Sequence, residues 1–197
     1  MRLPRLITWQ QTVTQNNARF KILRCGRRTG KTFYFIIDSL SLGLLYPNLS
    51  MAYVGLTYGH AKDVVWEDYI KLAGGLIEYK NSQELIIRLH NGSRIKLYSW
   101  DSVDNMLGKK YHKVYLDECA VAKNLKKAWE DVIEPTLLDY HGEALFASMP
   151  RGKGQFKAMI DESKKKDDWQ DFHFTSYDND TIPNVREDLD RKRRDIA

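Results

Sequence analysis

Residues Cys25-Gly26-Arg27-Arg28-Thr29-Gly30-Lys31-Thr32 decide the fold that we expect for this chain. They follow an apolar run, Phe20 to Leu23, and precede a segment with helical patterning, Phe33 to Tyr46. In a strand–loop–helix unit of this kind, glycines let backbone N–H groups turn toward an anion, and the helix N-terminus adds partial positive charge. Lys31 then reaches the β- and γ-phosphates of a nucleotide, and the Thr32 hydroxyl binds Mg²⁺.

The loop departs at one position from the usual phosphate-loop pattern, G-x-x-x-x-G-K-[ST]. Cys25 stands where the first glycine is expected, and Gly26 comes one place later. A bare Gly-Lys-Thr sequence is also common by chance, so the alternative is an ordinary glycine turn with Thr32 as a capping residue. The rest of the chain has to decide between the two.

A pair of adjacent carboxylates, Asp117 and Glu118, follows Lys113 to Leu116, which has the pattern of a short buried strand. Open α/β sheets bind ligands at the carboxyl ends of their strands. There Asp117 can hold Mg²⁺ through water, and Glu118 can orient or deprotonate an attacking water. The alternative is that Asp117 caps the next turn and Glu118 is solvated. The lysine loop earlier in the chain favours the interpretation that Asp117 and Glu118 form a metal-binding and catalytic site.

Length and composition fit one domain spanning residues 1–197. Of the 197 residues, 43% are apolar and 29% charged, which is enough for a sizeable core. The 31 basic and 26 acidic side chains give a net charge of +5, which permits a polyanionic partner without demonstrating one. No apolar run approaches the roughly 18 residues of a membrane span. The two cysteines, Cys25 and Cys119, form no disulfide framework and are expected to be small buried side chains in a reducing cytosol.

The remaining patterns alternate strands with helices, which predicts an α/β fold with a mostly parallel sheet and helices on both faces. Asn91-Gly92 lies between alternating runs, so we expect a β-hairpin to interrupt the alternation. Residues 101–110 are expected to form a polar connection. The expected strands are 51–56, 76–79, 84–89, 93–100, 143–148 and 169–175, and the expected helices are 57–73, 125–139 with a break at Pro135, 155–165 and 185–197.

An aromatic–amide pair, Trp9-Gln10, precedes the lysine loop by about twenty residues. A flat ring beside an amide suits an adenine base, which can be stacked upon and hydrogen-bonded. The alternative, which the sequence favours, is that this segment packs its tryptophan onto the domain.

Taken in order, these motifs resemble the ATPase domain of the terminase large subunit, the DNA-packaging motor of tailed bacteriophages. The resemblance extends from about Leu6 to the C-terminal helix. The family tolerates the missing first glycine and typically has arginine inside its phosphate loop. The resemblance implies a P-loop NTPase fold of the RecA/ASCE-like type with an inserted hairpin, and ATP and Mg²⁺ as cofactors. It rests on Trp9-Gln10 and on residues 26–32, 91–95, 114–118 and 148–152.

The resemblance also implies roles for individual residues. Glu118, Lys31 and Arg27 are the expected catalytic residues, with Arg27 as a cis-acting arginine; such a group near the γ-phosphate raises rates by about 10³–10⁵. Thr32 and Asp117 are the expected metal ligands. The expected nucleotide-binding residues are Trp9, Gln10 at the adenine-sensing position, Gly26, Arg27, Arg28, Thr29, Gly30, Lys31 and Thr32, and the expected coupling segment is Ser148, Met149 and Pro150.

The partners implied by the resemblance are double-stranded DNA, the portal protein and the small terminase subunit. We expect a monomer in isolation, a homo-oligomeric ring on the procapsid, a location in the host cell cytoplasm and no membrane association. Terminases continue into a nuclease domain with clustered acidic metal ligands. No such cluster follows Glu118, so we expect this chain to be the motor domain alone, without nuclease activity.

Two stretches depart from the family pattern. The coupling segment has Ser-Met-Pro where a small residue and threonine are commoner, and Leu107-Gly108-Lys109-Lys110 stands where relatives often have arginine. A finger donated by a neighbouring subunit is therefore unassigned among Lys109, Lys110, Arg94 and Arg151. Lysine-rich runs near 123–127, 151–157 and 164–166 either contact DNA or are solvated faces.

Three other functions remain open at this point. The nearest is a RecA-like helicase domain, although such a helicase usually needs a second domain of the same kind. Another is a DNA-binding module with an inactive nucleotide site. The third is a small-molecule kinase, which needs a mobile lid that the hairpin is poorly suited to provide.

Overall fold

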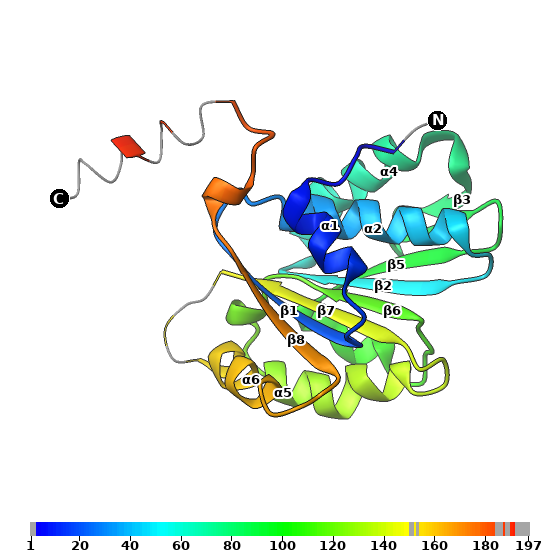
Figure 1. Ribbon diagram of the computed structural model, residues 1–197. Helices are drawn as coiled ribbons and strands as arrows, with labels where there is room; N and C mark the ends of the chain where they lie inside the picture. The colour runs from blue at the N-terminus through cyan, green and yellow to red at the C-terminus, as the bar shows by residue number, and fades with distance from the viewer. Residues whose placement is uncertain (1–2, 150–151, 153, 184–186, 188–189, 192–197) are drawn as a thin grey trace.

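The computed structural model describes residues 3–149, 152, 154–183, 187 and 190–191. Within these residues the chain forms an eight-stranded sheet of order β3-β4-β5-β2-β6-β7-β1-β8 (Figure 1). The strands are β1 Phe20–Cys25, β2 Ser50–Gly55, β3 Ile77–Asn81, β4 Ile86–Leu89, β5 Arg94–Ser99, β6 Lys113–Leu116, β7 Glu143–Ser148 and β8 Trp169–Phe174.

The sheet is mostly parallel, as the sequence predicts. Every neighbouring pair from β5 to β8 is parallel, whereas β4 is antiparallel to both β3 and β5. The hairpin turn lies at Asn91-Gly92, where Gly92 has a φ of +84° that glycine adopts without strain. The Asn91 side chain accepts a hydrogen bond from the Ser93 N–H and closes the turn. The inserted hairpin is thus confirmed.

Helices cover both faces of the sheet (Figure 1). One layer holds α1 Thr8–Gln15, α2 Lys31–Leu45 and a continuous helical stretch built from α3 Tyr58–His60, a π-helical turn Ala61–Trp66 and α4 Glu67–Ala73. The opposite layer holds α6 Gln155–Ser163 and a second stretch built from α5 Leu125–Lys127, a π-helical turn Ala128–Ile133 and a 3₁₀ turn Glu134–Leu137.

The buried strands contribute alternate side chains to two separate cores, because successive residues of a strand point to opposite faces. In β1, Leu23 packs in the core beneath α1 and α2, whereas Ile22 packs in the core against α6. In β7, Leu145 packs in the same core as Leu23, and Phe146 packs in the same core as Ile22. This double burial explains why the strands are nearly continuous apolar runs.

Several boundaries differ from those predicted. Residues Trp100–Met106 form a 3₁₀ helix inside the expected polar connection. The helix expected to break at Pro135 changes to a 3₁₀ turn one residue earlier, because Pro135 has no N–H to donate. The helix expected over 185–197 falls mostly outside the described residues. No helix in the described part of the chain is long and apolar enough to cross a membrane.

Candidate nucleotide site

The predicted site residues lie at the carboxyl edge of the sheet. The 26–32 loop leaves β1, and α2 begins at Lys31. Asp117 and Glu118 leave β6, and β7, which pairs with both β1 and β6, ends between them at Ser148. Topology therefore brings three chain segments that are distant in sequence to one place.

Side-chain contacts join the two motifs directly. Lys31 Nζ lies 2.7 Å from Glu118 Oε1 and 3.6 Å from Asp117 Oδ1. The hydroxyl of Thr32 donates a hydrogen bond of 2.6 Å to Asp117 Oδ2. The expectation that the lysine loop and the acidic pair meet at one edge is confirmed.

Asp117 is a buried carboxylate with a full set of donors. It is 1% exposed, and besides Thr32 it accepts hydrogen bonds from the Tyr53 hydroxyl at 3.0 Å and from the Glu118 N–H at 2.9 Å. The Trp100 indole N–H donates to its backbone carbonyl at 2.8 Å. These contacts fix the carboxylate and satisfy a charge that would otherwise be costly to bury.

Lys31 stays protonated at neutral pH. Burial by itself lowers the pKa of this ammonium, but the carboxylates of Asp117 and Glu118 outweigh burial and raise the pKa above its usual value. A fixed cation beside a phosphate-loop backbone is the arrangement that binds a polyphosphate.

Glu118 occupies a strained backbone conformation. Its φ of 54° and ψ of 38° lie in the left-handed region, which is uncommon for a residue with a Cβ. The next turn is held by Ser148, whose Oγ accepts a hydrogen bond of 3.1 Å from the Ala120 N–H. Strain kept in place by such neighbours is typical of functional positions.

The segment after β8 braces the phosphate loop, a role that sequence reasoning missed. Ser176 Oγ donates to the Arg27 carbonyl and Asn179 Nδ2 to the Arg28 carbonyl, each at 2.7 Å. Gly26 fits closely here, because a Cβ at this position would come within 3.1 Å of the Ser176 backbone nitrogen and Ser176 would have to shift. Figure 1 shows this segment in orange beside the loop between β1 and α2. No local pattern predicts a contact between residues about 150 positions apart.

A sequence profile described as the N-terminal part of the terminase large subunit, T4-like virus type, matches residues 22–194. The chain belongs to this terminase family. The large terminase subunit of Escherichia phage T5 is 32% identical over 187 residues, which cover 91% of this chain and 41% of that protein. This terminase chain therefore spans less than half the length of that relative.

Solved terminase structures share the fold. The large terminase ATPase domain of Thermus phage P74-26 superimposes with a TM-score of 0.76 at 23% identity, over 96% of this chain and 87% of that one. The large terminase of bacteriophage HK97 gives a TM-score of 0.68 at 15% identity, over 87% of this chain and 39% of that one. The P-loop NTPase fold expected of a terminase is thus confirmed.

Trp9 and Gln10 of this terminase lie against the phosphate loop, but neither is open to a base. Trp9 is 4% exposed, packs on Tyr34 and Phe174, and donates its indole N–H to the Thr29 carbonyl. Gln10 is 2% exposed, with its oxygen bonded to the Ile7 N–H and its amide nitrogen 3.4 Å from the Gly30 carbonyl. Trp9 therefore packs beneath the loop, as the alternative interpretation has it, and offers no face for stacking.

The two loop arginines are free to meet a ligand. The side chains of Arg27 and Arg28 are exposed, and within the described residues neither guanidinium has a hydrogen-bond or ion-pair partner. Arg28 has a φ of 58°, so the loop turns through a left-handed residue just before Thr29. Thr29 in turn is buried and donates its hydroxyl to the Gly26 carbonyl at 3.1 Å, which closes the loop on itself.

Other terminase residues singled out in the sequence take different positions. Met149 is half-buried beside Ser148, and Pro150 lies outside the described residues, as does Arg151. Arg94 opens β5 and donates to Ser50 at the start of β2, so it lies at the edge of the sheet opposite the phosphate loop.

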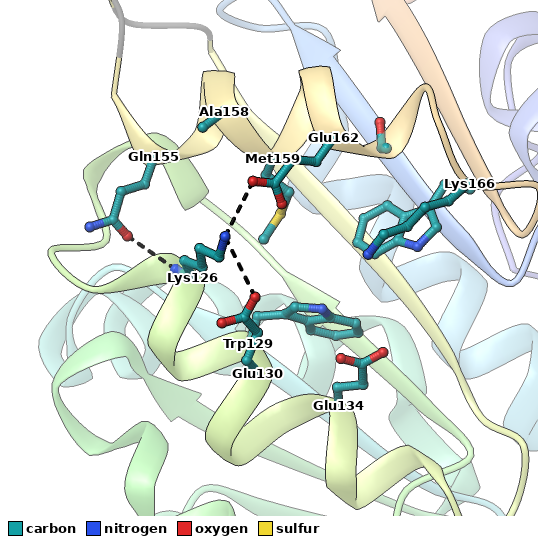
Figure 2. A pocket seen from close by; sticks show the side chains of 11 residues that line it. Lys126, Trp129, Glu130, Glu134, Gln155, Ala158, Met159, Glu162 and Lys166 are labelled. Carbon is teal, nitrogen blue, oxygen red and sulfur yellow. Dashed lines mark hydrogen bonds and ion pairs between the residues drawn. The ribbon is translucent and has the colours of Figure 1, made fainter.

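The lysine-rich runs are partly committed to ion pairs within the chain. Lys126 bridges Glu130 and Glu162 and so ties the helix carrying α5 to α6 (Figure 2). Lys157 pairs with Asp161, and outside these runs the finger candidate Lys110 pairs with Asp139. These contacts support the solvated-face interpretation of the lysines concerned.

Proposed function

We propose that this chain is the ATP-hydrolysing motor domain of a terminase large subunit and drives double-stranded DNA into the procapsid. One observation carries the proposal: the contact of Lys31 with Glu118 and of Thr32 with Asp117, at 2.7 and 2.6 Å. A phosphate-binding cation, a hydroxyl and two carboxylates at one sheet edge are the groups that phosphoryl transfer to water requires.

The pair formed by Thr32 and Asp117 suits a magnesium ion. Both side chains present oxygen, the donor that Mg²⁺ prefers, and the buried carboxylate supplies charge. When bound, Mg²⁺ neutralises charge on the β- and γ-phosphates. The protein's own residues supply the other functions. Lys31 binds the phosphates, and Arg27 stabilises charge that develops on the γ-phosphate. Glu118 orients the attacking water and accepts its proton.

The resting contacts give this mechanism an order of events. Glu118 is engaged by Lys31 through Oε1, which competes with its use as the base that positions water while the pair is closed. A polyphosphate competes with Glu118 for the ammonium, so nucleotide binding releases the carboxylate to act as a base. We propose that the coupling residues Ser148, Met149 and Pro150 pass this change to the DNA-gripping surfaces. The first of them, Ser148, contacts the turn that follows Glu118.

Partners follow from the same proposal. The domain acts with the portal protein and the small terminase subunit, as a homo-oligomeric ring on the procapsid in the host cytoplasm and as a monomer in isolation. Within the described residues no three His, Cys, Asp or Glu side chains gather as a metal-binding group. Absence of nuclease activity in this chain stays a prediction.

Binding and turnover of Mg²⁺-ATP by the wild type, Lys31→Ala and Glu118→Gln test the proposal. Lys31→Ala is expected to abolish binding, while Glu118→Gln keeps binding and loses turnover by about 10²–10⁴, the usual contribution of a general base. Arg88→Ala and Glu78→Gln, which break an exposed ion pair between β3 and β4 away from the site, are the controls.

Two outcomes would contradict this function. Undiminished ATP binding by Lys31→Ala would remove the phosphate loop from the mechanism. Equal ATPase rates for the wild type and Glu118→Ala, with DNA binding intact, would select a DNA-binding module with an inactive nucleotide site.

A further inference from the structure

A cavity of about 220 Å³ opens directly beside the phosphate loop at Gly30. Pockets that enclose a whole small ligand measure roughly 300–1,000 Å³, so this space suits the base-and-sugar half of a nucleotide. Because Gly30 belongs to both the loop and the cavity wall, the two are continuous. The cavity is lined by Arg5, Ile7, Gln10, Gly30, Phe33, Asn179 and Thr181.

The polar side chains in this wall are largely satisfied within the protein. Gln10 is bonded to Ile7 and Gly30. Asn179 donates to the Arg28 carbonyl and accepts from both the N–H and the hydroxyl of Thr181. Gln10 and Asn179 are only 2% and 5% exposed, so neither amide presents its remaining N–H donor openly to the edge of a base.

Phe33 and Arg5 line the cavity with side chains that are exposed and available to contact a ligand. Phe33 is 38% exposed, and it follows Lys31 and Thr32 in the first turn of α2. Arg5 is exposed and has no hydrogen-bond or ion-pair partner in the part of the chain that the structure describes. A flat ring and a planar cation stack on the faces of bases whatever the base's hydrogen-bonding edge.

We propose that Phe33 supplies the stacking face for the base of the bound nucleotide and that Arg5 supports the base as a planar cation. The inference rests on the proposed function, because it needs a nucleotide whose phosphates lie at Lys31. Phe33 takes the part that the sequence suggested for Trp9, whose ring is buried. Recognition by stacking favours the larger purine bases over pyrimidines and separates adenine from guanine only weakly.

The test compares a nucleotide with a ligand that lacks the base. Fluorescent 1,N⁶-etheno-ATP with Mg²⁺ is titrated into wild type, Phe33→Ala, Phe33→Tyr and Arg5→Gln, and ATP, CTP and inorganic tripolyphosphate are used as competitors. Leu45→Ala, an exposed apolar residue at the far end of α2, is the control. Thermal unfolding of each variant shows that it is folded.

Phe33→Ala is expected to weaken ATP binding about ten- to a hundredfold, the usual worth of one stacked base, and to leave tripolyphosphate binding unchanged. Phe33→Tyr restores binding to within about twofold, because it restores the ring. Arg5→Gln weakens ATP binding about two- to fivefold, as an exposed cation–π contact does. In the wild type, ATP outcompetes CTP, and bound etheno-ATP is quenched.

Unchanged ATP affinity in Phe33→Ala overturns the inference. Equal losses for ATP and tripolyphosphate also overturn it, since they mean that the phosphate loop was disturbed and no base contact was removed. If the wild type binds neither ligand, the proposed function itself fails, and this inference fails with it.

Discussion

The ammonium nitrogen of Lys31 lies 2.7 Å from a carboxylate oxygen of Glu118, although the two residues are 87 positions apart. Their contact spans β7, which separates β1 from β6 in the sheet. The pair holds the phosphate-binding cation and the water-activating carboxylate of the proposed mechanism against each other. Hydrolysis therefore requires a ligand that separates them, and ATP supplies the competing negative charge.

Tyr53 is expected to support Mg²⁺ binding by holding the Asp117 carboxylate in place. Its hydroxyl donates to Asp117 Oδ2 at 3.0 Å, and Tyr53→Phe removes this bond while keeping the buried ring. Loss of one such bond costs about 1–2 kcal/mol of unfolding free energy. A looser Asp117 should also raise the Mg²⁺ concentration needed for half-maximal ATPase activity. Urea unfolding and a Mg²⁺ titration measure the two effects.

Tyr69→Phe is the matched control, because that buried hydroxyl bonds Ser39 and does not reach Asp117. It should lose stability with no change in Mg²⁺ dependence. A shift in Mg²⁺ dependence of equal size in both variants would show that Tyr53 acts through general stability alone.

Much of the fold could be predicted because it is encoded locally. The strands 113–116 and 143–148 have the predicted bounds, since burial on both faces demands apolar residues at all but their end positions. The 3₁₀ helix at Trp100–Met106 could not be predicted, because a single irregular turn leaves no periodic pattern.

The site was predictable only where a motif carries the chemistry. Lys31, Thr32, Asp117 and Glu118 stand in recognisable sequences, and the topology of a parallel sheet brings them together. The hydrogen bond from Asn179 to the Arg28 carbonyl joins residues 151 positions apart, and no local sequence pattern predicts it. Similarly, whether an aromatic ring meets a base or the core is decided by tertiary packing.

Asn179 should control nucleotide affinity through the phosphate loop. It is 5% exposed, and Asn179→Leu keeps the approximate volume while removing the donor to the Arg28 carbonyl. Leaving that carbonyl unpaired costs about 1–3 kcal/mol, and part of the cost falls on the loop conformation that binds phosphate. We expect ATP and tripolyphosphate affinity to fall together, each roughly tenfold. Calorimetric titration of both ligands measures this.

Thr181→Val is the control for that experiment, since it removes only the hydroxyl that donates to Asn179 Oδ1. Its affinity for both ligands should stay within about twofold of the wild type. A loss confined to ATP in Asn179→Leu would instead show that Asn179 contributes to binding the base and not to the phosphate-loop conformation.

Both cysteine thiols should be inert in the native protein. Cys25 and Cys119 are 0% and 1% exposed, and burial raises the pKa of Cys25 from 9.0 to about 12 and that of Cys119 well above its ordinary value. A disulfide reagent at pH 8 should therefore titrate both thiols only after unfolding by guanidinium. Rapid reaction of either thiol in the native state, at an unchanged circular dichroism spectrum, would contradict this.

The same raised pKa sets the direction in which Cys25 changes stability at alkaline pH. Below pH 9 the Cys25 thiol is protonated in both the folded and unfolded chains, so its contribution is constant. Between pH 9 and about 12 only the unfolded chain ionises, and stability falls with rising pH across that window. Thermal unfolding from pH 8 to pH 11 should show a slope that is smaller in Cys25→Ala.

Ser148 should affect turnover more than binding. Its Oγ accepts from the Ala120 N–H at 3.1 Å and so holds the turn that keeps Glu118 in its left-handed conformation. Ser148→Ala removes this acceptor without touching the 26–32 loop. We expect kcat to fall by roughly tenfold, about 1.4 kcal/mol of barrier, with ATP affinity unchanged. Steady-state kinetics together with equilibrium nucleotide binding separate the two quantities.

Two further variants decide whether the Ser148 hydroxyl acts by positioning Glu118. Ser148→Thr keeps an acceptor oxygen and should restore most of the turnover. Ser163→Ala removes another buried hydroxyl, bonded to the Ile160 carbonyl in α6, and should leave kcat unchanged. If Ser163→Ala slows turnover as much as Ser148→Ala does, or if Ser148→Ala weakens ATP binding in step with kcat, the hydroxyl serves only general stability. With the expected pattern, the link from β7 to the turn after β6 is the contact that keeps the catalytic carboxylate in place.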